Sequence, residues 1–219
     1  MIWVMSSPVP QRARSAAAKQ QRQQAILDAA RALGTKRGVR EVTLTDIAAV
    51  VGMHKSAMLR YFETREQIFL ALTAADWQEW SAALRTELAE PSTAADIATV
   101  LARTLVARPL FCDLLAQAPM NLERNVSLEV ALEFKITVLG EVAAIAAELH
   151  RLLGLTDTAA TDVISTATAM AGALWQMAAP GTQLRVLYET RPELAHAIVD
   201  LEPRLSRILT ALLIGLSAH

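Results

Sequence analysis

Three side chains near residue 55 are of types that can contact the edges of nucleic-acid bases. Lys55, Ser56 and Arg60 fall on the outer face of a short predicted helix, whose inner face carries Met58 and Phe62 at a spacing of four. Lysine and arginine contact guanine more often than any other base in the major groove. The pattern therefore indicates a base-reading surface. The alternative is that Lys55 and Arg60 are solvated surface charges.

A preceding helix must hold this segment in place. Thr43 is expected to begin that helix, since its hydroxyl and the carboxyl group of Asp46 can form a capping box. Gly52 stands where a helix end needs a positive φ, and a second helix is predicted over 55–62. The residues expected to pack the helices together are Ile47, Ala48, Ala49, Val50 and Val51. Two short helices joined by a tight turn with glycine form a helix-turn-helix, whose second helix enters the major groove.

The charge distribution agrees with a polyanionic partner for the N-terminal part of the chain. The net charge of the 219 residues is −1, but residues 1–66 hold 11 basic and 5 acidic residues, a net of +6. Residues 67–219 hold the other 10 basic and 17 acidic residues, a net of −7. Such asymmetry indicates a basic head that meets a polyanion and an acidic body that does not.

The rest of the chain predicts helices. There is no strand-like alternation long enough for a sheet and no internal repeat, so the fold class is all-α. A first helix is expected over 16–35 and a loop over 180–186. Residues 1–14 are expected to be a flexible arm whose Arg12 and Arg14 could contact phosphate. The later helices are expected over 65–89, 93–107, a short stretch ending at 118, 127–153, 157–179 and 192–217.

From Ile26 to Phe69 the chain resembles the DNA-binding head of the tetracycline-repressor (TetR) family of bacterial transcriptional regulators. The matching segments are ILDAARAL, Gly38, VTLTDIAAVVG and KSAMLRYFETREQIF. The resemblance implies an N-terminal three-helix helix-turn-helix head and a C-terminal helical bundle that binds a ligand and dimerises. It divides the chain into a flexible arm (1–14), a DNA-binding domain (15–64) and a ligand-binding and dimerisation domain (65–219).

The resemblance also implies individual DNA contacts. Phosphate contacts are expected from Thr43, Thr45, Tyr61 and Arg65, assisted by helix amides. Groove contacts are expected from His54, Lys55, Ser56, Ala57 and Arg60, where a small alanine can accept a thymine methyl group. Tyr61 could equally be half-buried packing.

Three residues depart from the family pattern. The family usually has an aromatic residue near Gly34, a small hydroxyl residue at His54 and a phosphate-binding tyrosine at Leu59. We expect Gly34 to leave its space to other side chains. The changes bear on affinity and operator sequence more than on the fold.

A DNA reader of this class usually dimerises so that two recognition helices occupy successive major grooves about 34 to 36 Å apart. In the family, two helices from each copy form the interface. The candidate interface residues are Met170, Leu174, Trp175, Leu205, Ile208, Leu209 and Leu212. Each stripe could instead face its own core, because buried helices look the same in sequence.

In the family, the middle helices enclose a pocket for a small molecule, here expected to be largely apolar. The candidate lining residues are Trp77, Trp80, Leu84, Phe111, Met120, Phe134 and Val138. The alternative is that this aromatic and methionine stripe is ordinary core.

The sequence does not favour an enzyme, a metal site or a bound cofactor. Its four histidines lack metal-ligand spacing, and no phosphate loop or serine-nucleophile motif is present. A helical adaptor or scaffold that binds no specific DNA sequence is the alternative function, although an adaptor has no need of a +6 head. The expected protein is therefore a sequence-specific repressor that responds to a ligand and acts as a homodimer on a palindromic operator.

Two further features indicate a cytoplasmic protein that does not enter a membrane. The lone Cys112 excludes an intrachain disulfide and is expected to be a small core residue. No apolar run reaches the roughly 18 residues of a spanning helix, and MIWVM is too short for a signal-peptide core. Translation could begin at Met1 or at Met5.

Overall fold

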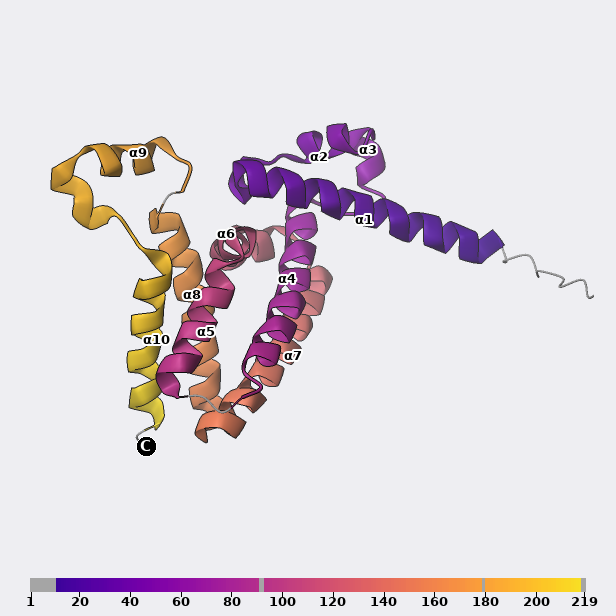
Figure 1. Cartoon of the computed structure of the whole chain (residues 1–219). Helices are drawn as coiled ribbons and strands as arrows, with labels where there is room; N and C mark the ends of the chain where they lie inside the picture. Colours follow the sequence, from indigo (N-terminus) through magenta and orange to yellow (C-terminus); the bar gives the residue numbers. More distant parts are fainter. Residues whose placement is uncertain (1–10, 91–92, 179, 218–219) are drawn as a thin grey trace, which may run out of the picture.

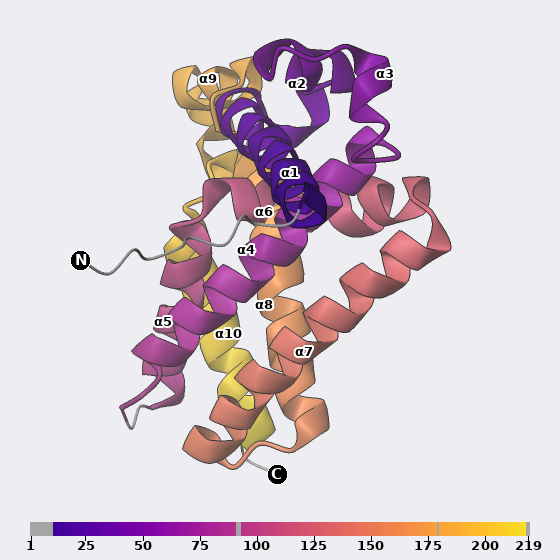
Figure 2. The same ribbon diagram turned by 90° about the vertical axis from the view of Figure 1, so that its right-hand side faces the viewer.

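In the computed structural model, which describes residues 11–90, 93–178 and 180–217, every regular element is a helix. The N-terminal helices form a head above a body made of the later helices, and two perpendicular views show the same division (Figures 1 and 2). The prediction of an all-α protein with a helix-turn-helix head and a helical C-terminal bundle is confirmed.

The head consists of α1 (Gln11–Arg37), the 3-10 turn η1 (Val39–Glu41), α2 (Leu44–Val50) and α3 (Lys55–Met58). α1 is longer at both ends than the predicted helix over 16–35. The predicted arm over 1–14 is therefore wrong for residues 11–14, which are helical. Its remaining part, 1–10, lies outside the described residues. α3 is shorter than the predicted 55–62, since residues 59–61 continue only as turns.

The body begins with α4 (Arg65–Glu87), α5 (Ala94–Val106) and α6 (Pro109–Gln117). A π-helical segment (Ala118–Leu122) and a 3-10 turn (Glu123–Asn125) lead into α7 (Leu128–Leu153) and α8 (Asp157–Ala178). The starts of three of these helices follow from local capping: Thr64, Thr93 and Ser127 each accept a backbone amide of the first turn. The predicted helices of this region agree with the structure to within about two residues at each end, the usual scatter of helix boundaries.

The C-terminal part differs from prediction. The expected loop over 180–186 contains the start of α9 (Gln183–Thr190), which Thr182 caps by accepting the amide of Arg185. The expected helix over 192–217 is broken: Pro192–Ala197 is a 3-10 segment, and α10 spans only Leu201–Ser217. In the described part of the chain, no helix has both the length and the apolar character needed to cross a membrane.

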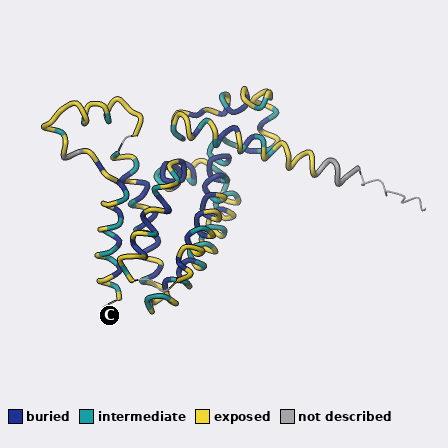
Figure 3. The backbone as a smooth tube through the Cα atoms, viewed as in Figure 1, coloured by how far each residue is buried: buried dark blue, intermediate teal, exposed yellow. Residues whose placement is uncertain are grey.

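Two hydrophobic clusters hold the molecule together. One lies in the body, where α10 packs on α5 and α8, and α6 packs on α8. Gly172 allows that last contact, because a Cβ there would stand 2.8 Å from the backbone nitrogen of Ala116. The buried residues of both clusters appear as the dark inner faces of the helices in Figure 3.

The second cluster belongs to the head but extends into the body. It joins Ile26, Ile47 and Met58 of the head to Phe69 of α4 and Leu114 of α6. Gly34 leaves its space to other side chains, as expected: a Cβ on it would lie 3.1 Å from Leu110 and 3.4 Å from Phe69. The head is therefore packed directly on α4 and α6, and α4 contributes to both cores.

A partly buried ion pair ties α1 to α4 as well. The guanidinium group of Arg31 bonds the carboxylate of Asp76, whose side chain is only 5% exposed. Burial raises the pKa of the Asp76 carboxyl, and Arg31 opposes that rise. Removing Arg31 alone would leave a buried carboxylate unpaired, so the pair fixes where α1 sits.

Candidate DNA interface and ligand pocket

The helix-turn-helix is held rigid by local bonds at the start of α2. The hydroxyl of Thr43 accepts the amide of Asp46 at 3.2 Å, and the Asp46 carboxylate accepts the Thr43 amide at 2.8 Å. The predicted capping box is confirmed. Arg37 adds a bond to the same carboxylate at 2.9 Å. Arg37 and Thr43 hold the pKa of the Asp46 carboxyl well below its usual range.

The turn between the helices has the expected geometry. Gly52 has a φ of 64°, a conformation that glycine adopts without strain, and Met53 donates its amide to the carbonyl of Ala48 at 2.9 Å. Ile47 and Ala48 are buried as predicted, but Val50 is 59% exposed and Ala49 is exposed too. These two expectations were wrong, because seven residues of helix present only one narrow face to the core.

The outer face of α3 is free for a partner. Met58 and Phe62 are buried, whereas His54, Lys55, Ser56 and Arg60 are exposed. Ala57 is half-buried, and His54 makes no side-chain cap bond. Leu59, which was not predicted among the groove residues, is 52% exposed beside Arg60. Its apolar type is the signal that could have suggested contact with a thymine methyl group.

The residues expected at phosphates divide into two groups. Thr43 and Thr45 are exposed at the start of α2, and Tyr61 is half-buried against the head core. Arg65 is placed differently from the expectation. Its guanidinium group donates to the carbonyls of Val39 and Val42 and pairs with Glu66 at 2.9 Å.

Arg65 is thus committed to the protein itself. Its side chain is 14% exposed, and its guanidinium carbon lies 4.7 Å from the centre of the Phe69 ring. Val39 and Val42 are buried, and the arginine supplies the donors that their backbone carbonyls need. Its structural role is to bind the start of α4 to the head.

The aromatic residues expected to line a ligand pocket instead fill the body. Trp77 and Trp80 pack edge to face with ring centres 5.4 Å apart, and Phe111 lies 5.8 Å from Trp77. The Trp80 indole donates to the hydroxyl of Thr104 at 3.0 Å. Leu84 is also fully buried. These four residues pack in the core of the body, where the aromatic rings cover one another.

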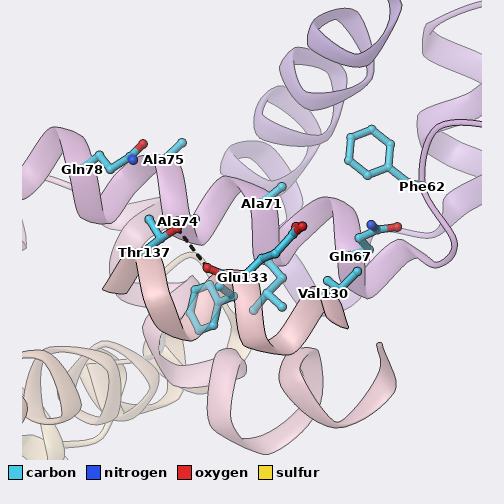
Figure 4. A pocket seen from close by; sticks show the side chains of 11 residues that line it. Phe62, Gln67, Ala71, Ala74, Ala75, Gln78, Val130, Glu133 and Thr137 are labelled. Carbon is cyan, nitrogen blue, oxygen red and sulfur yellow. Dashed lines mark hydrogen bonds between the residues drawn. The ribbon is translucent and has the colours of Figure 1, made fainter. Parts of the chain in front are cut away.

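A pocket of about 350 Å³ opens instead between α4 and α7 (Figure 4). Of the predicted lining residues, Phe134 borders it. Val138 is half-buried and packs against both cores, and Met120 is 73% exposed. The pocket is lined by Phe62, Gln67, Leu70, Ala71, Ala74, Ala75, Gln78, Val130, Glu133, Phe134 and Thr137.

The lining of this pocket is mixed in chemistry. Apolar groups from α4 and α7 form most of it, and Gln67, Gln78 and the carboxylate of Glu133 supply polar atoms (Figure 4). The Thr137 hydroxyl donates to the Glu133 backbone carbonyl at 3.0 Å. Phe62, four residues after the end of α3, reaches the same pocket. A molecule bound there would touch both the head and α7.

The residues expected at a dimer interface differ in how far they are buried. Leu174, Leu205 and Leu209 face the body core and are at most 2% exposed, so they are not available to a partner. Met170, Trp175, Ile208 and Leu212 are half-buried at the edges of that core. The exposed faces that remain on α8 and α10 carry Ser165, Ala169, Ala173 and Met177, and Ala211 and Ile214.

Cys112 is fully buried, as expected. Burial raises the pKa of its thiol to about 12. The thiol is therefore protonated at neutral pH and is not a nucleophile.

Comparison with known proteins agrees with this architecture. The model of bacterial regulatory proteins of the tetR family matches residues 26–72, and that of the tetracyclin repressor-like C-terminal domain matches residues 74–219. A comparison with curated proteins found no match.

Several solved structures share the fold. The fatty acid degradation regulator FadR from Bacillus halodurans is 16% identical, with a TM-score of 0.57 over 88% of this chain and 97% of that one. FadR from Bacillus subtilis, in complex with stearoyl-CoA, is 17% identical with the same coverage and TM-score. The Thermus thermophilus FadR repressor, in complex with lauroyl-CoA, is 19% identical, with a TM-score of 0.58 over 88% and 94% of the two chains.

Proposed function

The chain belongs to the tetracycline-repressor family of bacterial regulatory proteins, DNA-binding regulators of transcription, and on that premise we propose that it is a ligand-responsive repressor. It acts as a homodimer on a palindromic operator and is not an enzyme. It acts in the cytoplasm, the compartment that contains the DNA.

One observation carries the DNA contacts of this proposal. Met58 of α3 and Phe62, four residues further on, are buried, while Lys55, Ser56 and Arg60 project from the opposite face of a rigid head. The segment 54–60 enters the major groove, and Lys55 and Arg60 contact base edges. Thr43, Thr45 and Tyr61 contact phosphates at the edge of the groove. Arg65 is left out of this set.

Dimerisation uses the exposed faces of α8 and α10. Ala169, Ala173 and Ala211 allow close approach of helices from two copies, and Met177 and Ile214 add apolar surface to the contact. Met170, Trp175, Ile208 and Leu212 lie at the margin of the same surface. A two-fold contact of this kind places two heads side by side for two half-sites.

The ligand occupies the pocket between α4 and α7. It is a small and largely apolar molecule with polar groups that meet Gln67, Gln78 or Glu133. Phe62 packs in the core of the head, and α4 contributes to the cores of both head and body. Because both also form part of the pocket wall, ligand binding shifts the heads relative to the body. The acyl-CoA ligands named for the FadR structures show what related folds bind, and they are candidates to test here.

The experiment that tests the base contacts begins with duplexes selected from random DNA by the purified protein. Arg60→Ala should weaken binding to the selected sequence by about 1 to 3 kcal/mol and relax base preference at one position. Arg124→Ala, which removes an exposed arginine of the body, is the matched control. If the two variants select and bind the same sequences equally well, Arg60 has no part in reading DNA.

A further inference from the structure

α1 continues well beyond the part that packs in the head. It begins at Gln11, and the first buried residue among positions 17–37, whose burial the structure describes, is Ile26. At 1.5 Å per residue the intervening turns extend about 22 Å. They project past α3 on the side of the molecule away from α8 and α10, and the described side chains 17–22 are exposed (Figures 1 and 3).

This extension carries positive charge alone. The bases Arg12, Arg14, Lys19 and Arg22 all precede the first acidic residue of the chain, Asp28. Lys19 and Arg22 make no ion pair with any residue that the structure describes. Lys19 and Arg22 stand three residues apart on α1, where like charges repel each other, so this charge does not serve the stability of the helix.

The basic positions continue a face that is apolar further along α1. Residues 12, 19 and 22 fall at spacings of seven and three, and Ile26 and Ala30 follow on the same helical stripe. From Ile26 onward that stripe packs against the protein. Before it, Lys19 and Arg22 stand on the stripe and are exposed, so they face water or a polyanion rather than a protein core.

The composition of the extension favours nucleic acid over a membrane surface as its partner. Helices that lie on membranes need a face of large apolar residues, and between residues 11 and 24 the apolar residues are alanines only. The extension runs out past α3, whose outer face is the proposed groove-binding surface (Figure 1). A duplex bound by α3 would therefore run on toward these bases.

We propose that residues 11–25 form a basic arm that contacts the phosphates of duplex DNA flanking the bases read by α3. This inference rests on the proposed DNA-binding function and extends the site outward from each half-site. The contacts are electrostatic and independent of sequence, because they involve the backbone rather than base edges.

The test compares the full-length protein with the double variant K19Q/R22Q on a selected operator that has ten flanking base pairs on each side. Glutamine keeps helix propensity close to that of lysine and arginine, which preserves α1. The slope of log K against log salt concentration should fall by about 0.9 for each phosphate that the variant no longer neutralises. If two phosphate contacts are lost, the fall in affinity between 50 and 200 mM salt should be about tenfold smaller for the variant than for the unchanged protein. On a duplex cut back to the operator core, the two proteins should have the same slope.

The double variant R85Q/R124Q removes two exposed charges from the body and is the matched control. A K19Q/R22Q slope equal to that of the unchanged protein on the long duplex would overturn the arm, and so would an equal reduction of the slope in the control. A protein that binds no duplex at all would overturn the proposed function together with the arm. A reduced slope with unchanged base preference supports the arm alone.

Discussion

The carboxylate of Asp113 accepts a hydrogen bond from the backbone amide of Val39 across 2.7 Å, although 74 residues separate the two in sequence. Its other oxygen accepts the side-chain amide of Gln176 at 2.8 Å. One buried side chain of α6 therefore joins the head to α8, the helix proposed to meet the second copy. Changes at the dimer surface and at the head are linked through this bond and through the contact of α6 with α8.

Replacing Asp113 by asparagine should loosen this link. The Val39 amide and the Gln176 side-chain amide both donate to Asp113. Asparagine has only one side-chain oxygen, and its NH2 group would face the second donor and leave it without an acceptor. We expect the free energy of unfolding to fall by about 1 to 3 kcal/mol, measured by urea denaturation. Gln176→Ala removes one bond and should cost less, about 0.5 to 1.5 kcal/mol. Equal stability of D113N and the unchanged protein would contradict the linking role.

The capping box of α2 should make stability depend on pH. The pKa of Asp46 is lowered in the folded protein from its ordinary value of 3.8, so its stabilising effect is present above that value. It is lost as the pH falls through the lower, folded pKa. Asp46→Asn should therefore be less stable than the unchanged protein at pH 7, and the difference should shrink in the acid range. A difference that stays constant from pH 7 to pH 2 would contradict the charged cap.

The proposed dimer surface can be tested on α8. Ala173→Arg places a large cation on the exposed small-residue face and should shift the protein to the monomer, measured by light scattering after size-exclusion chromatography. Operator binding should weaken with it, since one head reads only one half-site. Ala143→Arg introduces the same side chain on the exposed face of α7 as the control. A dimer that survives A173R but dissociates with A143R would place the interface on α7.

The pocket can be closed from α4. Ala74→Phe fills space between α4 and α7, so binding of the neutral dye Nile red, followed by its fluorescence, should fall several-fold relative to the unchanged protein. Ala147→Phe adds the same ring at an exposed position of α7 outside the pocket. Undiminished dye binding by A74F would mean that the dye and the pocket are unrelated. Thermal unfolding of both variants checks that the fold is kept.

Much of the fold could be predicted because helix ends depend on neighbouring residues. The start of α2 is marked by the capping box of Thr43 and Asp46, and the start of α5 by Thr93, through bonds that span three residues. The turn after α2 is marked by Gly52 with its positive φ. The helix α9 was missed although Thr182 caps it, because it has only eight residues and none of them is buried.

Side-chain roles that depend on distant partners could not be predicted in the same way. Arg65 has the type and position of a phosphate ligand, yet the carbonyls that hold it come from residues 23 and 26 positions earlier. Trp80 and Phe111 have the types of a ligand pocket, and only their mutual packing across 5.9 Å identifies them as core. The polar residues of the pocket, such as Glu133, left no periodic signal in the sequence.

Sequence-specific DNA binding is tested most simply by a competition measurement. Fluorescence anisotropy would follow the purified protein on labelled DNA selected from a random pool, with a scrambled duplex of equal length as competitor. A sequence-specific regulator should bind tightly, should not be displaced by the scrambled duplex, and should lose affinity steeply as the salt concentration rises. Equal displacement by both duplexes, or a flat salt response, would contradict a sequence-specific regulator that grips DNA with its basic head.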